Sequence, residues 1–234
     1  MRPFYGVNGA SASYLKDVAK DNPAFYAIDR NMFRLLADFQ CKITPSIGWA
    51  AGIAFWDFRM GHVKMDKYRN ERTLWDLYTE GDAPVIPLSQ QGGGSQMGLK
   101  AGLVYDTRDH EPAPSRGIWA EVIAYGSPDI FERQGNEYLK ISAQFRQYIT
   151  LAPNRLVAAY RLAYQGTVAG TAPFYIQQNI STLYLRQIAS EGLGGKNTVR
   201  GILMNRMVGD GYFWANAEFR LRLFDFRFLK QDWY

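Results

Sequence analysis

The residues that could carry acid–base, nucleophilic or metal chemistry are few and widely separated. The chain has two histidines, His62 and His110, and a single cysteine, Cys41. Zinc sites draw on imidazole and thiolate ligands at short spacings, and the two histidines show no such spacing. Cys41 falls on the apolar face of an expected strand, where an inert thiol is the usual outcome. Gly-x-Ser-x-Gly and His-Glu-x-x-His motifs are also absent from the sequence, so we expect no enzyme activity, catalytic residue, metal or cofactor.

Two glycine clusters suggest phosphate binding at first sight. Residues 92–94 form a lone glycine run that we assign to a loop. Residues 194–198 resemble a phosphate-binding loop, but that motif needs Ser or Thr directly after its lysine and a glycine five residues before its second glycine. Those positions hold Asn197 and Ser190, so we reject a nucleotide site.

The segment 105–109 brings two carboxylates and a guanidinium together in Asp106, Arg108 and Asp109. Alternation along a strand puts Asp106 and Arg108 on one face and Asp109 at the strand end. A catalytic carboxylate pair is conceivable. We favour an ion cluster that lines a lumen or stabilises a turn.

Composition limits the kind of protein that could position these residues. The chain has 234 residues, of which 47% are hydrophobic and 15% aromatic, so it is not disordered. One cysteine excludes an internal disulfide framework, and no apolar run approaches the roughly 18 residues of a spanning helix. The net charge of +5 comes from singly scattered basic residues, so we expect no nucleic-acid partner. A soluble domain and a β-barrel, which alternates polar and apolar residues, both remain.

The hydrophobic period is two along most of the chain. Residues 137–151 place Leu139, Ile141 and Phe145 on one face and Lys140 and Gln144 on the other, which predicts a strand with one apolar and one strongly polar face. A short helix is expected within residues 66–77, packed down by Trp75. We expect strands over residues 33–43, 47–58, 97–108, 117–125, 137–151, 155–165 and 212–224, and another that begins within 226–234.

These features favour an all-β fold, an antiparallel transmembrane β-barrel, over a soluble β-sandwich. The expected strands are longer than the usual 5–6 residues and match the roughly 9–11 residues of a tilted membrane strand. Short turns alternate with long connections over residues 61–96 and 166–208. Aromatic residues gather near strand ends, and we interpret them as interfacial girdles: Trp49, Phe55, Trp56, Phe58, Tyr148, Tyr212, Phe213 and Trp214.

Two motifs resemble those of the bacterial surface antigen (BamA/TamA) family of outer-membrane assembly factors. Residues 105–109 are followed by a proline pair, Ser115, Arg116, Gly117 and a strand. Residues 192–201, ending in Val199, Arg200 and Gly201, resemble the Gly-Gly and Val-Arg-Gly signature of a long loop. The two motifs occur in the family's order, and residues 3–7 resemble a segment of some members.

The resemblance implies a sixteen-stranded barrel whose sixth extracellular loop folds back into the lumen. Arg200, in the motif Val199-Arg200-Gly201, would pair there with a lumenal acid, and Glu218 is the candidate. Asp106, Arg108, Asp109 and Gly117 would form the turn motif.

Two positions depart from the family pattern. Residue 202 is Ile where the family usually has Phe or Tyr, and a second lumenal acid has no clear match, with Asp225 and Asp232 as unaligned candidates.

At the scale of the whole chain, we expect one partial barrel domain over residues 1–234, about eight strands of the sixteen, without POTRA domains. Residues 1–6 show no signal peptide, which agrees with a fragment.

The function implied by the resemblance is insertion, assembly or translocation of proteins at the outer membrane of a Gram-negative bacterium. Partners would be outer-membrane lipids, unfolded outer-membrane proteins and accessory lipoproteins. A passive channel or a barrel that anchors another activity is the alternative, and a soluble β-sandwich binding domain is the weaker one. Effects on outer-membrane protein levels separate the first two, and recovery without detergent would indicate the third.

Overall fold

A computed structural model describes residues 2–7, 12–128, 136–181, 187–188, 192–223, 226–228 and 231–233. Strands dominate it, and the helices are short. In chain order the elements are β1 (Arg2–Pro3), α1 (Lys16–Asp21), β2 (Ala27–Lys42), β3 (Ile47–Gly61), η1 (Asp66–Tyr68), α2 (Leu74–Thr79), α3 (Leu88–Gln91), β4 (Gly93–Asp106), β5 (Gly117–Ser127), β6 (Tyr138–Ala152), β7 (Leu156–Gly170), α4 (Phe174–Gln177), β8 (Ile180–Ser181), β9 (Gln187–Ile188), β10 (Gly211–Leu221), β11 (Phe226–Phe228) and β12 (Gln231–Trp233).

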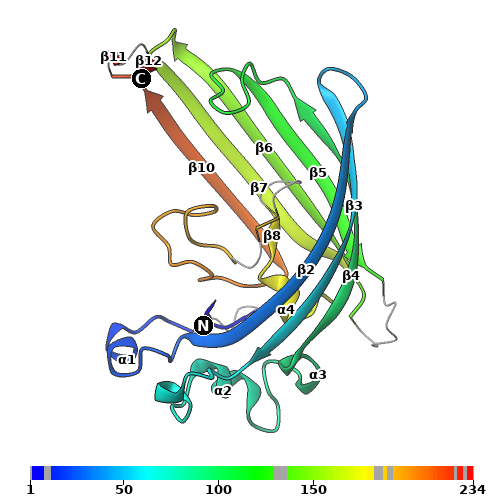
Figure 1. Ribbon diagram of the computed structural model, residues 1–234, viewed down its shortest axis with the longest axis vertical. Coiled ribbons are helices and arrows are strands. Elements are labelled where there is room, and N and C mark those ends of the chain that lie inside the picture. The colour runs from blue at the N-terminus through cyan, green and yellow to red at the C-terminus, as the bar shows by residue number, and fades with distance from the viewer. Residues whose placement is uncertain are drawn as a thin grey trace.

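One curved antiparallel sheet forms the body of the molecule (Figure 1). Its eight strands follow the order β1-β2-β3-β4-β5-β6-β7-β10, so neighbours in the sheet are neighbours in the chain except where β7 meets β10. Each pair from β2 to β7 is a hairpin, and β10 pairs with β7 over its whole length, from Gly211 opposite Gly166 to Leu221 opposite Leu156. The sheet bends around a concave face, with β1 and β10 at its two edges.

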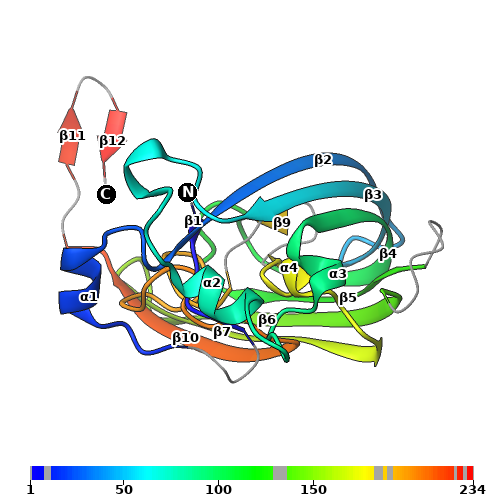
Figure 2. The ribbon, with the colours of Figure 1, turned by 90° about the horizontal axis from the view of Figure 1, so that it is seen from below.

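The two ends of the sheet differ in the length of their connections. At one end, residues 43–46, 107–116 and 153–155 join consecutive strands. At the other, residues 62–92 carry η1, α2 and α3, and residues 171–210 carry α4, β8 and β9. Figure 2 shows α2, α3 and α4 together at this second end. We call the described residues of 171–210 the inserted loop, because they lie on the concave side of the sheet (Figure 1).

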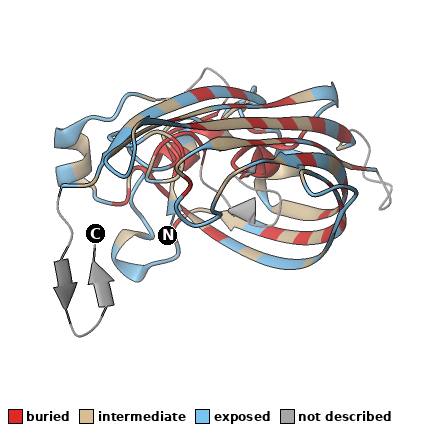
Figure 3. Ribbon diagram, turned by 90° about the horizontal axis from the view of Figure 1, so that it is seen from above, coloured by how far each residue is buried: buried red, intermediate tan, exposed pale blue. Residues whose placement is uncertain are grey.

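The distribution of burial is inverted relative to a water-soluble sheet. The convex face exposes large apolar side chains, whereas charged and amide side chains on the concave face are buried, and Figure 3 shows the resulting bands along the strands. The exposed set includes Phe33, Leu35, Phe39, Ile53, Leu99, Leu103, Val122, Phe213 and Phe219, and the buried set includes Lys100, Glu121, Lys140, Gln144 and Gln165. Water would penalise such a convex face, and a lipid phase would not. A β-sandwich would bury this face against a second sheet, so that alternative is wrong.

The apolar core sits on the concave side near the end with long connections. Phe4, from the N-terminal segment, meets Trp75 and Tyr78 of α2 edge to face, with ring centroids 5.7 and 5.4 Å apart. Tyr175 of α4 lies 5.2 Å from the ring of Phe58 on β3. The N-terminal segment, the helices and the inserted loop therefore form a common interior beneath the sheet. No helix among the described residues is long and apolar enough to span a membrane.

The strands expected from alternation are present, with earlier starts for several of them. β4 begins at Gly93, so the glycine run 92–94 is not wholly a loop as predicted. Gly93 has φ +87°, and a Cβ there would collide with the carbonyl oxygen of Phe58, which explains a glycine at the start of this strand. The helix expected over residues 66–77 is instead the single turn η1 followed by α2, in which Trp75 is buried as predicted.

The interpretation of the strand-end aromatics as girdles is wrong for most of them. Trp49 and Phe213 lie exposed on the convex face. Five others are buried on the concave side: Trp56, Phe58, Tyr148, Tyr212 and Trp214. Consecutive strand residues point to opposite faces, so a cluster of adjacent aromatics cannot lie on one face.

Candidate functional site

The inserted loop is tied to the concave face by hydrogen bonds from strand side chains to its backbone. Gln165 of β7 donates to the Asn179 carbonyl at 2.8 Å, and the Tyr212 hydroxyl of β10 donates to the Gln177 carbonyl at 2.8 Å. Lys140 of β6, with a fully buried side chain, donates to the Asp210 carbonyl at 3.3 Å. Buried backbone carbonyls need hydrogen-bond donors. The loop therefore explains why one face of each of these strands is polar in the sequence.

Arg161 forms the densest of these attachments. Its guanidinium donates to Asn216 Oδ1 from Nε at 3.0 Å and from Nη2 at 2.6 Å, and Nη2 also reaches the Asn197 carbonyl at 2.8 Å. Asn216 in turn donates to the Thr198 carbonyl at 3.0 Å. Arg161 and Asn216 face each other in register on β7 and β10, so the pairing of these strands places both beneath the loop.

The conformation of residues 192–201 depends on Thr198 and glycine. The Thr198 hydroxyl donates to the Gly194 carbonyl and accepts from the Gly194 amide, both at 2.9 Å, which closes a compact turn. Val199 packs against a small cluster that includes Leu193 and Trp214. Gly201 has φ +85°, and a Cβ added there would meet no atom within 4 Å, so its backbone angle alone favours glycine.

Arg200 and Glu218, paired by the family resemblance, lie near each other in the structure. Arg200 Nη1 is 3.7 Å from Glu218 Oε2, and 77% of the Arg200 side chain is exposed. Arg220 is closer, with Nη2 2.5 Å and Nε 2.7 Å from Glu218 Oε1. The carboxylate is therefore shared by two arginines, and the pair with Arg200 is solvated. An exposed pair of this kind contributes about 0–1 kcal/mol.

The turn motif lies at the opposite end of the sheet from the helices. Arg108 grips Asp106 with two parallel bonds, Nε to Oδ1 at 2.9 Å and Nη2 to Oδ2 at 2.8 Å. Gly117 has φ +103°, and a Cβ there would collide with the Thr107 carbonyl oxygen. These residues therefore shape the β4–β5 connection, and Asp106 and Asp109 form no shared carboxylate pair.

Asp109 organises the rest of this connection. Its Oδ1 accepts from the amides of Ser115 at 2.9 Å, His110 at 3.0 Å and Arg116 at 3.3 Å, and the Ser115 hydroxyl donates to Oδ2. The hydroxyl bond from Ser115, followed by the amide bonds, holds the pKa of Asp109 well below its ordinary value. The hydrogen bonds of this turn thus stabilise the ionised form of the Asp109 carboxylate.

The remaining candidates lie apart from these two regions. His62 is in the β3–β4 connection, where Nε2 lies 3.2 Å from Asp76 Oδ2, and His110 is exposed in the β4–β5 connection. Cys41 is exposed on the convex face. Within the described ranges no three His, Cys, Asp or Glu side chains gather in a way that could hold a metal ion. Asp225 and the side chain of Asp232 lie outside the described residues.

Arg161 and Asn216 are site residues that the motif comparison missed. Both lie on the polar faces of predicted strands, and this position is the sequence feature that could have identified them. Their relevance depends on strand register, because only the pairing of β7 with β10 sets one opposite the other.

Comparison with known proteins adds family evidence to this geometry. The family model of the Omp85 superfamily domain matches residues 5–233. Among solved structures, the crystal structure of BamA from Haemophilus ducreyi lacking POTRA domains 1-3 resembles the chain with a TM-score of 0.48 and 18% sequence identity. That alignment covers 76% of this chain and 31% of the BamA chain, so the present chain spans about a third of that structure. A search of curated proteins found no match.

Proposed function

Because the chain belongs to the Omp85 superfamily, we propose that it forms part of the wall of a BamA/TamA-type outer-membrane barrel that assists protein insertion, assembly or translocation. Superfamily members are non-enzymatic assembly or transport proteins of the outer membrane. The family match confirms the resemblance at the level of the Omp85 superfamily. The specific role within the superfamily is the proposal.

The observation that carries this proposal is the family match over residues 5–233. The inverted burial supports it, because a convex face bearing Phe33, Leu103 and Phe219 suits lipid acyl chains. Lipids of a Gram-negative outer membrane would cover this face. The client would be a nascent outer-membrane protein, and accessory lipoproteins are further candidate partners.

The proposed mechanism is non-covalent. An incoming strand would pair through its backbone with an exposed strand at a barrel seam, as edge strands do generally. The described sheet would supply a stiff wall, and the inserted loop, with Val199, Arg200 and Gly201 docked over Glu218, would keep the interior ordered. Asp106, Arg108, Asp109 and Gly117 would fix the opposite rim.

A passive channel is the second candidate, and the position of the inserted loop weighs against it. The loop bonds to β6, β7 and β10 across the concave face, where a channel would need open space. Depletion of the protein from its host separates the two functions. We expect many unrelated outer-membrane proteins to fall in abundance together, whereas loss of one secreted substrate alone would refute the assembly role.

The role of the loop is tested by limited proteolysis of the folded protein. We expect Arg161→Ala to expose residues 192–201 to protease more than Arg200→Ala or Glu218→Ala, because Arg161 makes the shorter bonds. Arg155→Ala, in the exposed β6–β7 turn, is the control. Cleavage rates that do not differ from the control in any of the three variants would refute loop docking through these residues.

A further inference from the structure

A cavity of about 260 Å³ lies between the inserted loop and the concave faces of β6, β7 and β10. Its position distinguishes it from the apolar core, which lies nearer to the helices. The wall carries five cationic side chains and one carboxylate: Arg146, Arg161, Lys196, Arg200, Arg220 and Glu218. Such a concentration of one charge in a concave site raises the local concentration of anions.

Aromatic rings hold three of these arginines in place. The guanidinium of Arg146 lies 4.7 Å from the ring centroid of Trp119, that of Arg161 5.9 Å from Trp214, and that of Arg220 5.3 Å from Tyr148. Stacking engages the face of a guanidinium and leaves its in-plane N–H groups to meet acceptors. These contacts therefore restrict where the three guanidinium groups can lie before any ligand arrives.

The carboxylate of Glu218 balances only part of this charge. It is shared between Arg220 at 2.5 Å and Arg200 at 3.7 Å, while Arg161 contacts neutral acceptors in Asn216 and Asn197. Glu121 on β5 lies diagonal to Arg146 on the same face of the sheet, since it opposes Gln144, and its charge offsets part of that of Arg146 from outside the cavity wall. Two carboxylates thus face five cationic side chains. The cavity keeps a surplus of positive charge.

We propose that this cavity binds a phosphate-class oxyanion, either a free phosphate or a phosphorylated headgroup. The planar fork of arginine matches the oxygen spacing of phosphate and donates two bonds at once. The volume equals that of about nine waters at ~30 Å³ each, which is room for a tetrahedral anion and some of its hydration shell. A phosphate dianion also offsets more of the surplus charge than a single carboxylate does.

This inference goes beyond the assembly role and does not rest on it. A ligand here would touch the loop through Lys196 and Arg200 and the wall through Arg146 and Arg220, so it would add a further bridge between the two parts.

The test is titration of the full chain in lipid nanodiscs with pyrophosphate, followed by calorimetry or ³¹P line width. We expect saturable binding that weakens as salt rises. Arg220→Gln and Arg146→Gln should each weaken it by about tenfold or more, because each removes a charge-assisted hydrogen bond. Arg59→Gln, an exposed arginine on β3 outside the cavity, is the matched control and should leave binding unchanged.

The most informative variant is Glu218→Gln, because it should change the pyrophosphate affinity in the opposite direction to the arginine variants. Removing the one carboxylate in the cavity wall should strengthen pyrophosphate binding several-fold, which a misfolded variant cannot do. Equal affinity in Glu218→Gln, Arg220→Gln and Arg59→Gln would overturn the site. So would binding of an acidic peptide such as polyglutamate in the absence of any pyrophosphate binding.

The source of the anion follows from the lipid used. If phosphorylated headgroups enter the cavity, those with a net negative charge should bind best. Nanodiscs of phosphatidylglycerol should then compete with pyrophosphate, whereas those of phosphatidylcholine, whose phosphate is balanced by its own choline cation, should compete far less. Equal pyrophosphate affinity in both lipids would assign the site to a soluble phosphate. Either result supports an oxyanion site.

Discussion

A missing side chain at Gly52 makes one ion pair of the wall possible. Asp38 on β2 and Lys100 on β4 both stand in register with Gly52 on the strand between them. Lys100 Nζ reaches across the glycine to Asp38 Oδ1 at 2.7 Å, with both side chains largely buried. A Cβ on Gly52 would collide with that carboxylate and lie 2.7 Å from Lys100 Cε.

We therefore expect Gly52→Ala to push the two charges apart and to lower the free energy of unfolding by about 1–3 kcal/mol, as overpacking does. Urea unfolding of the protein in lipid vesicles measures this. Gly61→Ala at the end of the same strand is the control, because a Cβ added there would have nothing within 4 Å. Equal stability of the two variants would show that the Asp38–Lys100 ion pair does not need the space left by Gly52.

We expect the β4–β5 turn to loosen in acid, because it is organised by the ionised carboxylate of Asp109. Its pKa is lowered in the folded chain, chiefly by the Ser115 hydroxyl, so its contribution is complete above the unfolded carboxyl pKa of about 3.9. The contribution is lost as pH falls below that value toward the folded pKa. NMR of the Ser115 and Arg116 amides should show the turn intact at neutral pH and loosening only in strong acid.

Asp109→Asn should loosen the same amides already at neutral pH, because the neutral amide oxygen is a weaker acceptor. Glu111→Gln, an exposed acid in the same connection, should not. If Ser115 and Arg116 behave alike in both variants, the carboxylate does not organise the turn.

At the scale of the element, each long strand carries an exposed apolar side and a polar interior side. Leu35 in the middle of β2 is 65% exposed, and Ile43 just beyond its end is 62% exposed. If exposure alone mattered, a charged substitution would cost the same free energy of unfolding at both positions. A bilayer distinguishes them by depth.

Leu35→Arg should cost about 2–4 kcal/mol of unfolding free energy in vesicles, because the charge lies near the middle of the bilayer. Ile43→Arg should cost about 0–1 kcal/mol, since it lies near the interface. Equal and small costs at both positions would place the convex face of β2 in water.

The alternation of the sequence predicts the long strands and their two faces, because side-chain direction along a strand is strictly periodic, but it misses where β2 and β4 begin. It predicted Lys140 and Gln144 on the interior side, where they are buried. It did not predict how residues distant in sequence meet. The Arg161–Asn216 contact depends on pairing across the inserted loop, and the Asp38–Lys100 bridge depends on two registers at once.

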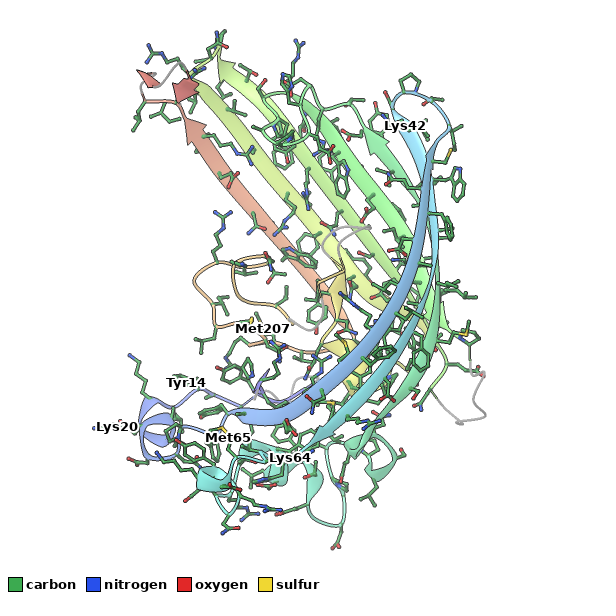
Figure 4. The ribbon with its side chains drawn as sticks, in the orientation of Figure 1. Tyr14, Lys20, Lys42, Lys64, Met65 and Met207 are labelled. Atoms are coloured by element: carbon green, nitrogen blue, oxygen red, sulfur yellow. The ribbon has the colours of Figure 1, made fainter. Side chains whose placement is uncertain are left out.

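Across the whole molecule, the N-terminal segment and the inserted loop hold each other. Asn205 Nδ2 donates to the Pro3 carbonyl at 2.7 Å, and the Arg206 guanidinium lies 5.4 Å from the ring centroid of Tyr5. Figure 4 marks Met207, from the same stretch of the loop, on the concave side of the sheet. This contact joins β1, at the start of the chain, to the loop between β7 and β10.

Asn205→Gly should speed hydrogen exchange at the Phe4 and Ala12 amides about two- to tenfold, the effect of losing one hydrogen bond. Asn205 has φ +60°, so glycine keeps the backbone unstrained and removes only the side chain. Asn154→Gly is the control, since Asn154 has φ +55° in the β6–β7 turn. Unchanged exchange at Phe4 and Ala12 would show that Asn205 does not hold the N-terminal segment.

The link from Asn205 to Pro3 also sets an order of events during folding. It joins residues 202 positions apart, and the entropy cost of closing such a loop falls only once the intervening hairpins have shortened it. The hairpins from β2 to β7 form from neighbouring segments and can therefore assemble first. We therefore expect the wall to form before the interior, and a chain that has just completed its strands still has to close this contact.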